Sequence, residues 1–263
     1  MPYDSPLRKP FCGDKAACPA DAPRISFGCD VADRELNGGL RADGLHEFYA
    51  RSRQDIVATI SFALLIGQLC RRRDGRTLIW AREVQAARNG GNPYGPGLAA
   101  LGIDTRKLVL LILPDAKAVL RAALDAARDA AVAAVVVELT GRQPQLDLTV
   151  TRRFALAAAE KDTMVLSTRL AASPTPSAAH SRWQIAAAPS RALDVHAPGA
   201  PAFEVELLRQ RGGRDGISFI MEWDGDSASF RLGNSAATAP SLPRPRSAMA
   251  VGGAGDMRRA SAA

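Results

Sequence analysis

The feature that most constrains this chain is a regular alternation of short apolar runs and longer helix-like segments between residues 33 and 170. Near-continuous apolar runs predict buried strands, here at residues 45–49, 77–81, 108–113, 134–139 and 163–167. The segments between them predict helices at residues 55–72, 98–101, 116–131 and 148–161, with a Gly/Pro/Asn-rich loop at 89–97. Strands that alternate with helices indicate an α/β fold with a mostly parallel, twisted sheet flanked by helices.

The pattern changes after residue 170. A Ser/Pro loop at residues 173–177 is followed by short expected strands at 183–187, 203–208, 217–223 and 229–232. The dipeptide Asp224-Gly225 is a hairpin signal between the last two, so we expect an antiparallel edge on the sheet. We therefore predict an irregular lead-in at residues 1–32, one domain at 33–233 and a disordered basic tail at 234–263, which is poor in large apolar residues.

The polar chemistry excludes several classes of function. The four cysteines lack C-x-x-C spacing and the three histidines are isolated, which predicts free thiols and neither a metal site nor acyl transfer. The N-terminus lacks the apolar core of a signal peptide. The apolar run at residues 56–70 is too short and too polar to cross a bilayer, so we expect a cytoplasmic protein with no membrane partner.

The net charge of +7 comes mostly from arginine and is compatible with nucleic acid or with an acidic protein. The densest cluster, Arg71-Arg72-Arg73, closes the expected helix at 55–72, where cations meet the negative end of the helix dipole. We favour that structural role, and the charge alone leaves DNA binding open.

The segment at residues 38–49, GGLRADGLHEFY, resembles the lead-in to the first core strand of the RecA family. In that family a phosphate-binding loop, G-x-x-x-x-G-K-[ST], follows at once; its glycines, lysine and hydroxyl hold phosphates and magnesium. Here both glycines, the lysine and the hydroxyl are missing, and no Gly-Lys dipeptide occurs anywhere in the chain. The degenerate loop contains Ala50, Arg51, Arg53, Asp55, Ile56 and Val57.

This loop predicts that no nucleotide cofactor is bound and that the protein is not an enzyme. Asp55 is expected to cap the following helix and to place a carboxylate where a phosphate would sit. Arg51 and Arg53 could attract an anion, but Ile56 and Val57 offer magnesium nothing.

Two further carboxylates match family positions. Glu138 ends an apolar strand where the resemblance implies the magnesium-holding aspartate (Walker B), and we favour a solvated carboxylate there. Glu83 falls near the family's water-activating glutamate, and is either a remnant of it or a surface helix residue.

The resemblance covers about residues 33–232. The segment 98–104, LAALGID, is similar to a family helix, and the segment 205–211, VELLRQR, is similar to its late strand with two cations. Arg209 and Arg211 stand at those cationic positions, where surface or partner contact is the safer interpretation without a nucleotide. The segment at 167–180 corresponds in position to a DNA-contacting loop of the family, although its composition is no evidence of that activity.

Among nucleotide-free relatives of RecA, the sequence resembles the ImuA family more than the shorter SulA-like inhibitors of cell division. The segments that favour this are 80–83 (WARE), 94–102 (YGPGLAALG) and the closing hairpin 219–224 (FIMEWD) with Phe230-Arg231. The resemblance implies a non-catalytic accessory protein of SOS-induced translesion synthesis. The implied partners are an ImuB-like protein and an error-prone C-family DNA polymerase, with RecA as a further candidate. The alternatives are a SulA-like division inhibitor, a diverged ATPase that uses Arg51, Arg53 and Glu138, and a plain DNA-binding protein.

Overall fold

The computed structural model describes residues 22–191, 199–213 and 215–233 of the 263-residue chain. The expected tail at 234–263, Cys12, Cys18 and His196 lie outside these ranges. The helical elements are α1 (Asp30–Glu35), η1 (Arg53–Asp55), α2 (Ile56–Asp74), α3 (Val84–Gly90), α4 (Gly95–Ala100), η2 (Thr105–Lys107), α5 (Ala116–Ala127) and α6 (Leu148–Lys161). The strands are β1 (Arg24–Ile25), β2 (Leu40–Arg41), β3 (Leu45–Ala50), β4 (Thr77–Glu83), β5 (Leu108–Leu113), β6 (Val132–Thr140), β7 (Met164–Leu170), β8 (Ser181–Ala187), β9 (Ala202–Gln210), β10 (Ile217–Asp224) and β11 (Ser229–Leu232).

The main sheet has nine strands in the order β11-β10-β9-β8-β3-β7-β6-β4-β5. All pairings from β8 through β3 to β5 are parallel, and those from β8 outward to β11 are antiparallel. The expected α/β class with C-terminal antiparallel strands is therefore confirmed. One detail differs: β8, which we expected within the antiparallel edge, pairs in parallel with β3 and begins the antiparallel part only on its other side.

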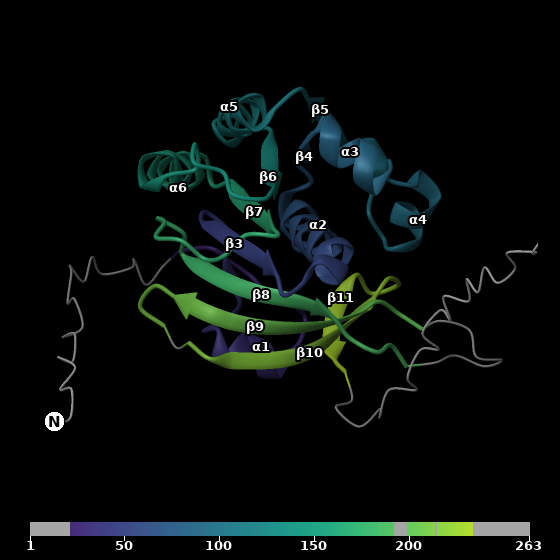
Figure 1. The fold of residues 1–263 in the computed structure, drawn as a ribbon. Helices are drawn as coiled ribbons and strands as arrows, with labels where there is room; N and C mark the ends of the chain where they lie inside the picture. The colour runs from purple at the N-terminus through teal and green to yellow at the C-terminus, as the bar shows by residue number, and fades with distance from the viewer. Residues whose placement is uncertain (1–21, 192–198, 214, 234–263) are drawn as a thin grey trace, which may run out of the picture.

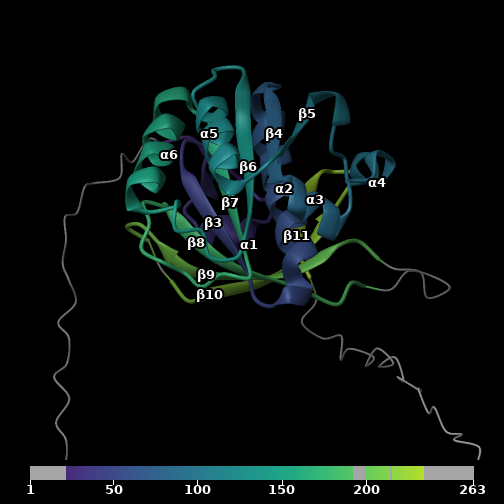
Figure 2. The same cartoon turned by 45° about the horizontal axis from the view of Figure 1, so that its top comes forward.

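Helices cover the two faces of the sheet differently (Figures 1 and 2). Helix α2 packs on one face, across β3, β4, β6, β7 and β8, whereas α5 and α6 pack side by side on the other. The α2 face is aromatic: the Phe62 ring lies 5.2–6.5 Å from the rings of four other phenylalanines, Phe27, Phe48, Phe203 and Phe230. The α5/α6 face is filled largely by alanine and valine, which lets these helices lie close to the strands.

The described part of the expected lead-in, residues 22–32, is ordered rather than irregular. It contains β1, which pairs with β2, and the start of α1. Phe27 is buried in the aromatic core, and its carbonyl accepts a hydrogen bond from the Phe230 N–H of β11. The sequence pattern missed this segment because its buried apolar residues are spaced too irregularly to show the period of a helix or a strand.

Two expected boundaries also shift. The expected loop at 89–97 includes the end of α3 and the start of α4, where Pro96 fits the first turn of a helix because its N–H is not needed there. Helix α5 ends at Ala127 rather than at residue 131. By contrast, β5, α6 and β11 have the expected bounds.

No helix in the described part of the chain is long and apolar enough to cross a membrane.

Candidate functional site

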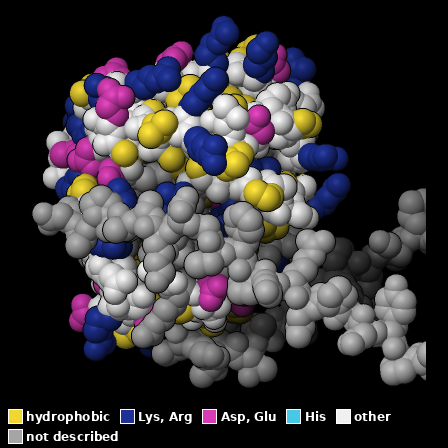
Figure 3. Space-filling view, turned by 90° about the vertical axis from the view of Figure 1, so that its left-hand side faces the viewer, with side chains coloured by type: hydrophobic (Ala, Val, Ile, Leu, Met, Phe, Trp, Pro, Cys, Tyr) yellow, Lys and Arg dark blue, Asp and Glu magenta, His cyan; other side chains and the backbone are white. Residues whose placement is uncertain are grey.

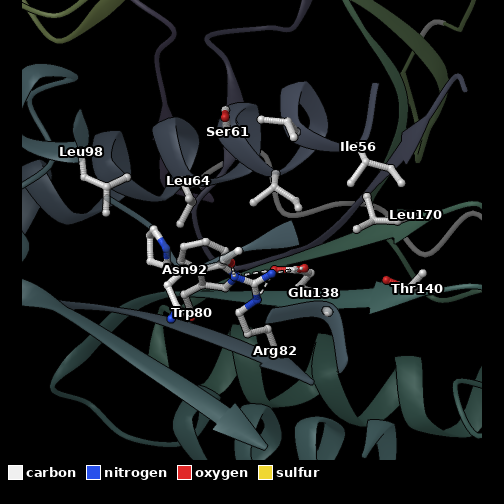
Figure 4. Close-up of a pocket in the computed structure, with 15 residues that line it drawn as sticks. Ile56, Ser61, Leu64, Trp80, Arg82, Asn92, Leu98, Glu138, Thr140 and Leu170 are labelled. Atoms are coloured by element: carbon white, nitrogen blue, oxygen red, sulfur yellow. Dashed lines mark hydrogen bonds and ion pairs between the residues drawn. The ribbon is translucent and has the colours of Figure 1, made fainter. Parts of the chain in front are cut away.

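A pocket of about 370 Å³ opens at the carboxyl ends of β4, β6 and β7, beside the first turns of α2 (Figure 4). In open parallel sheets, ligands bind at this edge, so this is the candidate site. Its walls are mostly apolar, and a buried cluster of polar side chains forms its floor. The lining residues are Ile56, Val57, Ile60, Ser61, Leu64, Trp80, Arg82, Ala86, Gly91, Asn92, Pro93, Leu98, Glu138, Thr140 and Leu170.

The segment between β3 and α2, which we expect to be a degenerate phosphate loop, is tied to the neighbouring strands. The Arg51 guanidinium donates to both carboxylate oxygens of Glu204 on β9, at 2.6 and 2.8 Å. This hydrogen-bonded pairing raises the pKa of Arg51 and lowers that of Glu204. The backbone N–H of Arg51 also donates a hydrogen bond to the Ile185 carbonyl at 2.9 Å. Arg51 is thus paired within the protein, and both Arg51 and Arg53 are exposed.

Asp55 does not cap α2 with its side chain, contrary to our expectation. Its carboxylate instead accepts hydrogen bonds from the Ser52 hydroxyl at 2.6 Å and from the Ala187 N–H, at the end of β8, at 2.9 Å. The reason is local: the turn of η1 is capped by Ser52, so Asp55 enters the helix from a 3-10 turn and points to β8. Asp55 therefore joins the loop to the sheet.

Ile56 and Val57 begin α2 and line the pocket. Ile56 is half-buried and Val57 is 70% exposed. We expect these positions to correspond to those where the family motif has groups that hold phosphate and magnesium. In this chain they contribute branched aliphatic side chains, which suit an apolar contact and not a solvated anion.

Glu138 is not the solvated carboxylate that we expected. Its side chain is 2% exposed, and it accepts hydrogen bonds from Trp80 Nε1 at 2.9 Å and from Arg82 Nη2 at 3.2 Å. Arg82 also stacks over the Trp80 ring, 5.0 Å from the centroid, and donates to the Gly91 carbonyl. Burial raises the pKa of Glu138 against the opposing effect of Arg82. The sequence pattern missed this because Arg82 reaches Glu138 from the adjacent strand β4.

Glu83 ends β4, one residue beyond Arg82, so its side chain points to the opposite face of the sheet. It is half-buried, it does not line the pocket, and burial, with Asp115 nearby, raises its pKa. Glu83 therefore lies outside the pocket lining, although its charge is near enough to add to the raised pKa of Glu138.

A buried ionic cluster that the sequence analysis missed lies on the central strand β3. Glu47 is fully buried, and its Oε2 accepts hydrogen bonds from Tyr49, Ser177 and Arg182 at 2.9–3.1 Å. Arg169 of β7 lies 3.8 Å from its Oε1. Burial and the Glu47 carboxylate raise the pKa of Tyr49 to about 12, which keeps the phenol a hydrogen-bond donor. The sequence did offer one signal for this cluster, because Glu47 is a charged residue in the middle of an apolar strand.

Two histidines that are isolated in sequence also meet in the fold, His46 on β3 and His180 directly before β8. The rings of His46 and His180 lie 5.8 Å apart. His46 Nε2 lies 2.8 Å from the Arg41 carbonyl and therefore carries the proton, so Nδ1 accepts from the Ser181 hydroxyl at 2.6 Å. Burial lowers the pKa of His46 to about 4 and that of His180 to about 3. Both are neutral structural groups at pH 7.

The remaining basic candidates differ in their surroundings. Arg72 donates to the Ser227 and Ala228 carbonyls, and Arg73 pairs with Asp74 and Asp162, so these two members of the 71–73 cluster tie α2 to neighbouring segments. Arg209 and Arg211 are exposed near the end of β9, far along the sheet from the pocket edge.

No protein-family model matches the chain. Protein ImuA from two strains of Caulobacter vibrioides is 33% identical over 210 residues, which cover 74% of this chain and 81% of that protein. The crystal structure of the RadB recombinase superposes with a TM-score of 0.51 at 14% identity, over 80% of this chain and 100% of the other. The expected RecA-like fold is confirmed.

Proposed function

This chain belongs to the ImuA family, and from that premise we propose that it is a non-catalytic accessory protein of SOS-induced mutagenesis in the bacterial cytoplasm. It acts through protein contacts and does not hydrolyse nucleotide. The proposed partners are an ImuB-like protein and an error-prone C-family polymerase in translesion synthesis, with RecA as a further candidate.

The observation that carries the proposal is that the groups at the former phosphate site are used within the protein itself. Arg51 is held by Glu204, Asp55 by Ser52 and Ala187, and Glu138 by Trp80 and Arg82. Binding a triphosphate with magnesium would require breaking these contacts and placing the ligand against Ile56 and Val57. Charged ligands left without partners in an apolar site are strongly disfavoured.

An open sheet edge supports action through protein contacts. Strand β5 ends the sheet, and its Val109 and Ile112 are 43% and 46% exposed. An edge strand presents unpaired backbone groups that can accept a strand from another protein, and apolar side chains on it favour such pairing.

The first test is nucleotide binding. With millimolar ATP and magnesium, we expect no change in the thermal midpoint of the full chain, with an active RecA-family ATPase as the positive control. Magnesium-dependent ATP turnover that disappears in a Glu138→Gln variant would overturn the proposal in favour of a diverged ATPase.

The second test is partner binding. We expect the purified chain to form a stoichiometric complex with the ImuB-like protein of its own host. A stoichiometric complex with the tubulin-like division protein, and none with the ImuB-like protein, would support the SulA-like alternative. DNA affinity that falls steeply with salt, in the absence of any protein complex, would support a plain DNA-binding protein.

A further inference from the structure

A second hollow lies away from the pocket, between the outer side of α6 and the segment that leads into β8. It has a volume of about 430 Å³ and is lined by Leu148, Arg152, Ala155, Leu156, Ser177, Ala178 and Arg211. The four lining residues from α6 fall at helical spacings of four, three and one, so they form one stripe along the helix. Nothing in the proposed function depends on this hollow.

The stripe exposes apolar surface that the fold does not use. Leu156 is 71% exposed and Leu148 is 39% exposed, whereas the core-facing side of α6 is formed by Thr151, Phe154, Ala157 and Ala158. Single exposed leucines are ordinary on protein surfaces. Here two leucines lie on either side of an arginine at the rim of one hollow. This arrangement favours a contact surface.

The charged side chains among the described lining of the hollow are basic. Arg152 from α6 and Arg211, directly after β9, line it, and no acidic residue is among the described lining residues. Figure 3 looks onto the side of the molecule where α6 lies, and Lys and Arg side chains stand out there among hydrophobic ones, with Asp and Glu side chains elsewhere on the same face. An occupant that complements this surface carries carboxylates beside an apolar side chain.

The floor of the hollow is fixed before any occupant arrives. The Ala178 N–H donates to Thr151 Oγ1 at 3.1 Å, which fastens the floor to α6. Ser177 donates to Glu47 at 2.9 Å and accepts from Arg182 at 3.0 Å, which fastens it to the buried ionic cluster. A preorganised surface loses little entropy on binding, so even a short segment can bind it.

We propose that this hollow docks a short segment of a partner protein in which an apolar side chain lies beside one or two carboxylates. The apolar side chain packs between Leu148 and Leu156, and the carboxylates pair with Arg152 and Arg211. A protein segment fits better than DNA because phosphates would pair with the arginines but leave both leucines in contact with water.

The test is a selection of random peptides of about a dozen residues against the full chain, followed by titration of the best synthetic peptide. We expect selected peptides to be enriched in Asp or Glu next to Leu or Phe. Leu156→Ser and Arg152→Glu should each weaken binding about tenfold or more. Arg153→Glu is the matched control, since Arg153 is exposed on the same helix but does not line the hollow, and it should change binding less than about twofold.

Three outcomes would overturn the proposal. The first is no enrichment, or peptides whose binding Leu156→Ser leaves unchanged. The second is single-stranded DNA binding that Arg152→Glu abolishes and Leu156→Ser does not, which makes the surface a nucleic-acid contact. The third is a homodimer that Leu156→Ser dissociates, which assigns the hollow to a second copy of the chain. All three are independent of the ATP test, so this proposal can fail while the proposed function stands.

Discussion

Glu47 and Glu138 are both buried carboxylates in the central part of one sheet, on strands separated only by β7, yet they are held very differently. Glu47 contacts side chains from four segments. These are Tyr49 of β3, Ser177 of the segment before β8, Arg182 of β8 and Arg169 of β7. Glu138 has Trp80 and Arg82, both from β4, and lies at the floor of an open pocket.

The difference separates contacts that hold segments of the fold together from contacts at the edge where a ligand would bind. The Glu47 cluster fastens four segments to one another, so it belongs to the framework. The Glu138 pair is a local contact between two adjacent strands at the edge where a ligand would bind. The framework and the pocket edge are therefore held by separate sets of contacts.

The largest loss of stability is expected when Glu47 is neutralised. Glu47→Gln leaves buried Arg169 and partly buried Arg182 without a compensating charge, and we expect it to lower the free energy of unfolding by about 3–5 kcal/mol. Chemical denaturation of the two proteins measures this. Glu160→Gln, at an exposed pair with Lys161, is the control and should change stability by less than about 0.5 kcal/mol. Equal effects of the two substitutions would show that Glu47 is no framework residue.

The histidine pair extends the test to the other face of β3. His46 has its pKa lowered to about 4 from 6.5, so the unfolded chain binds more protons than the native state between these values. Stability contributed by neutral His46 is complete above pH 6.5 and is lost as the pH falls toward 4. Between pH 6.5 and about pH 4.5 we expect His46 alone to account for about 2–3 kcal/mol.

Denaturation of the wild type and of His46→Gln at both pH values isolates this contribution. Glutamine can still accept from Ser181 and donate to the Arg41 carbonyl, but it does not titrate. The variant should therefore lose less stability on acidification than the wild type. Parallel losses in both proteins would show that His46 is not held neutral by the fold.

The same comparison shows which parts of the structure could be predicted from sequence. The bounds of β5 and α6 follow from local runs of apolar residues, and the missing glycines and lysine of the phosphate loop are visible without a structure. The partners of the polar residues were not predictable, because Glu47 and Arg182 are 135 residues apart and meet only when β3 pairs with β8. The same dependence on strand pairing explains the error at Glu138.

At the pocket edge we expect a smaller effect. In Glu138→Gln the amide can still accept from Trp80, and Arg82 keeps its bond to the Gly91 carbonyl beside a pocket that water can enter. We expect the free energy of unfolding to fall by about 1–2 kcal/mol, which is less than the Glu47→Gln effect. Denaturation of both variants in one buffer compares them directly. A loss as large as that of Glu47→Gln would mean that both carboxylates belong to the framework.

The smallest effect is expected at Asp55, which joins the former phosphate loop to β8. In Asp55→Asn the side-chain oxygen can still accept from the Ala187 N–H, while the charge-assisted bond from Ser52 is weakened. We expect a loss of about 1 kcal/mol in the free energy of unfolding and still no thermal shift with magnesium and ATP. Ser52→Ala, which removes the other partner, should cost about as much. If Asp55→Asn gained a nucleotide-dependent shift, the carboxylate would be the main barrier to phosphate, and the pocket edge would still be a nucleotide site in all other respects.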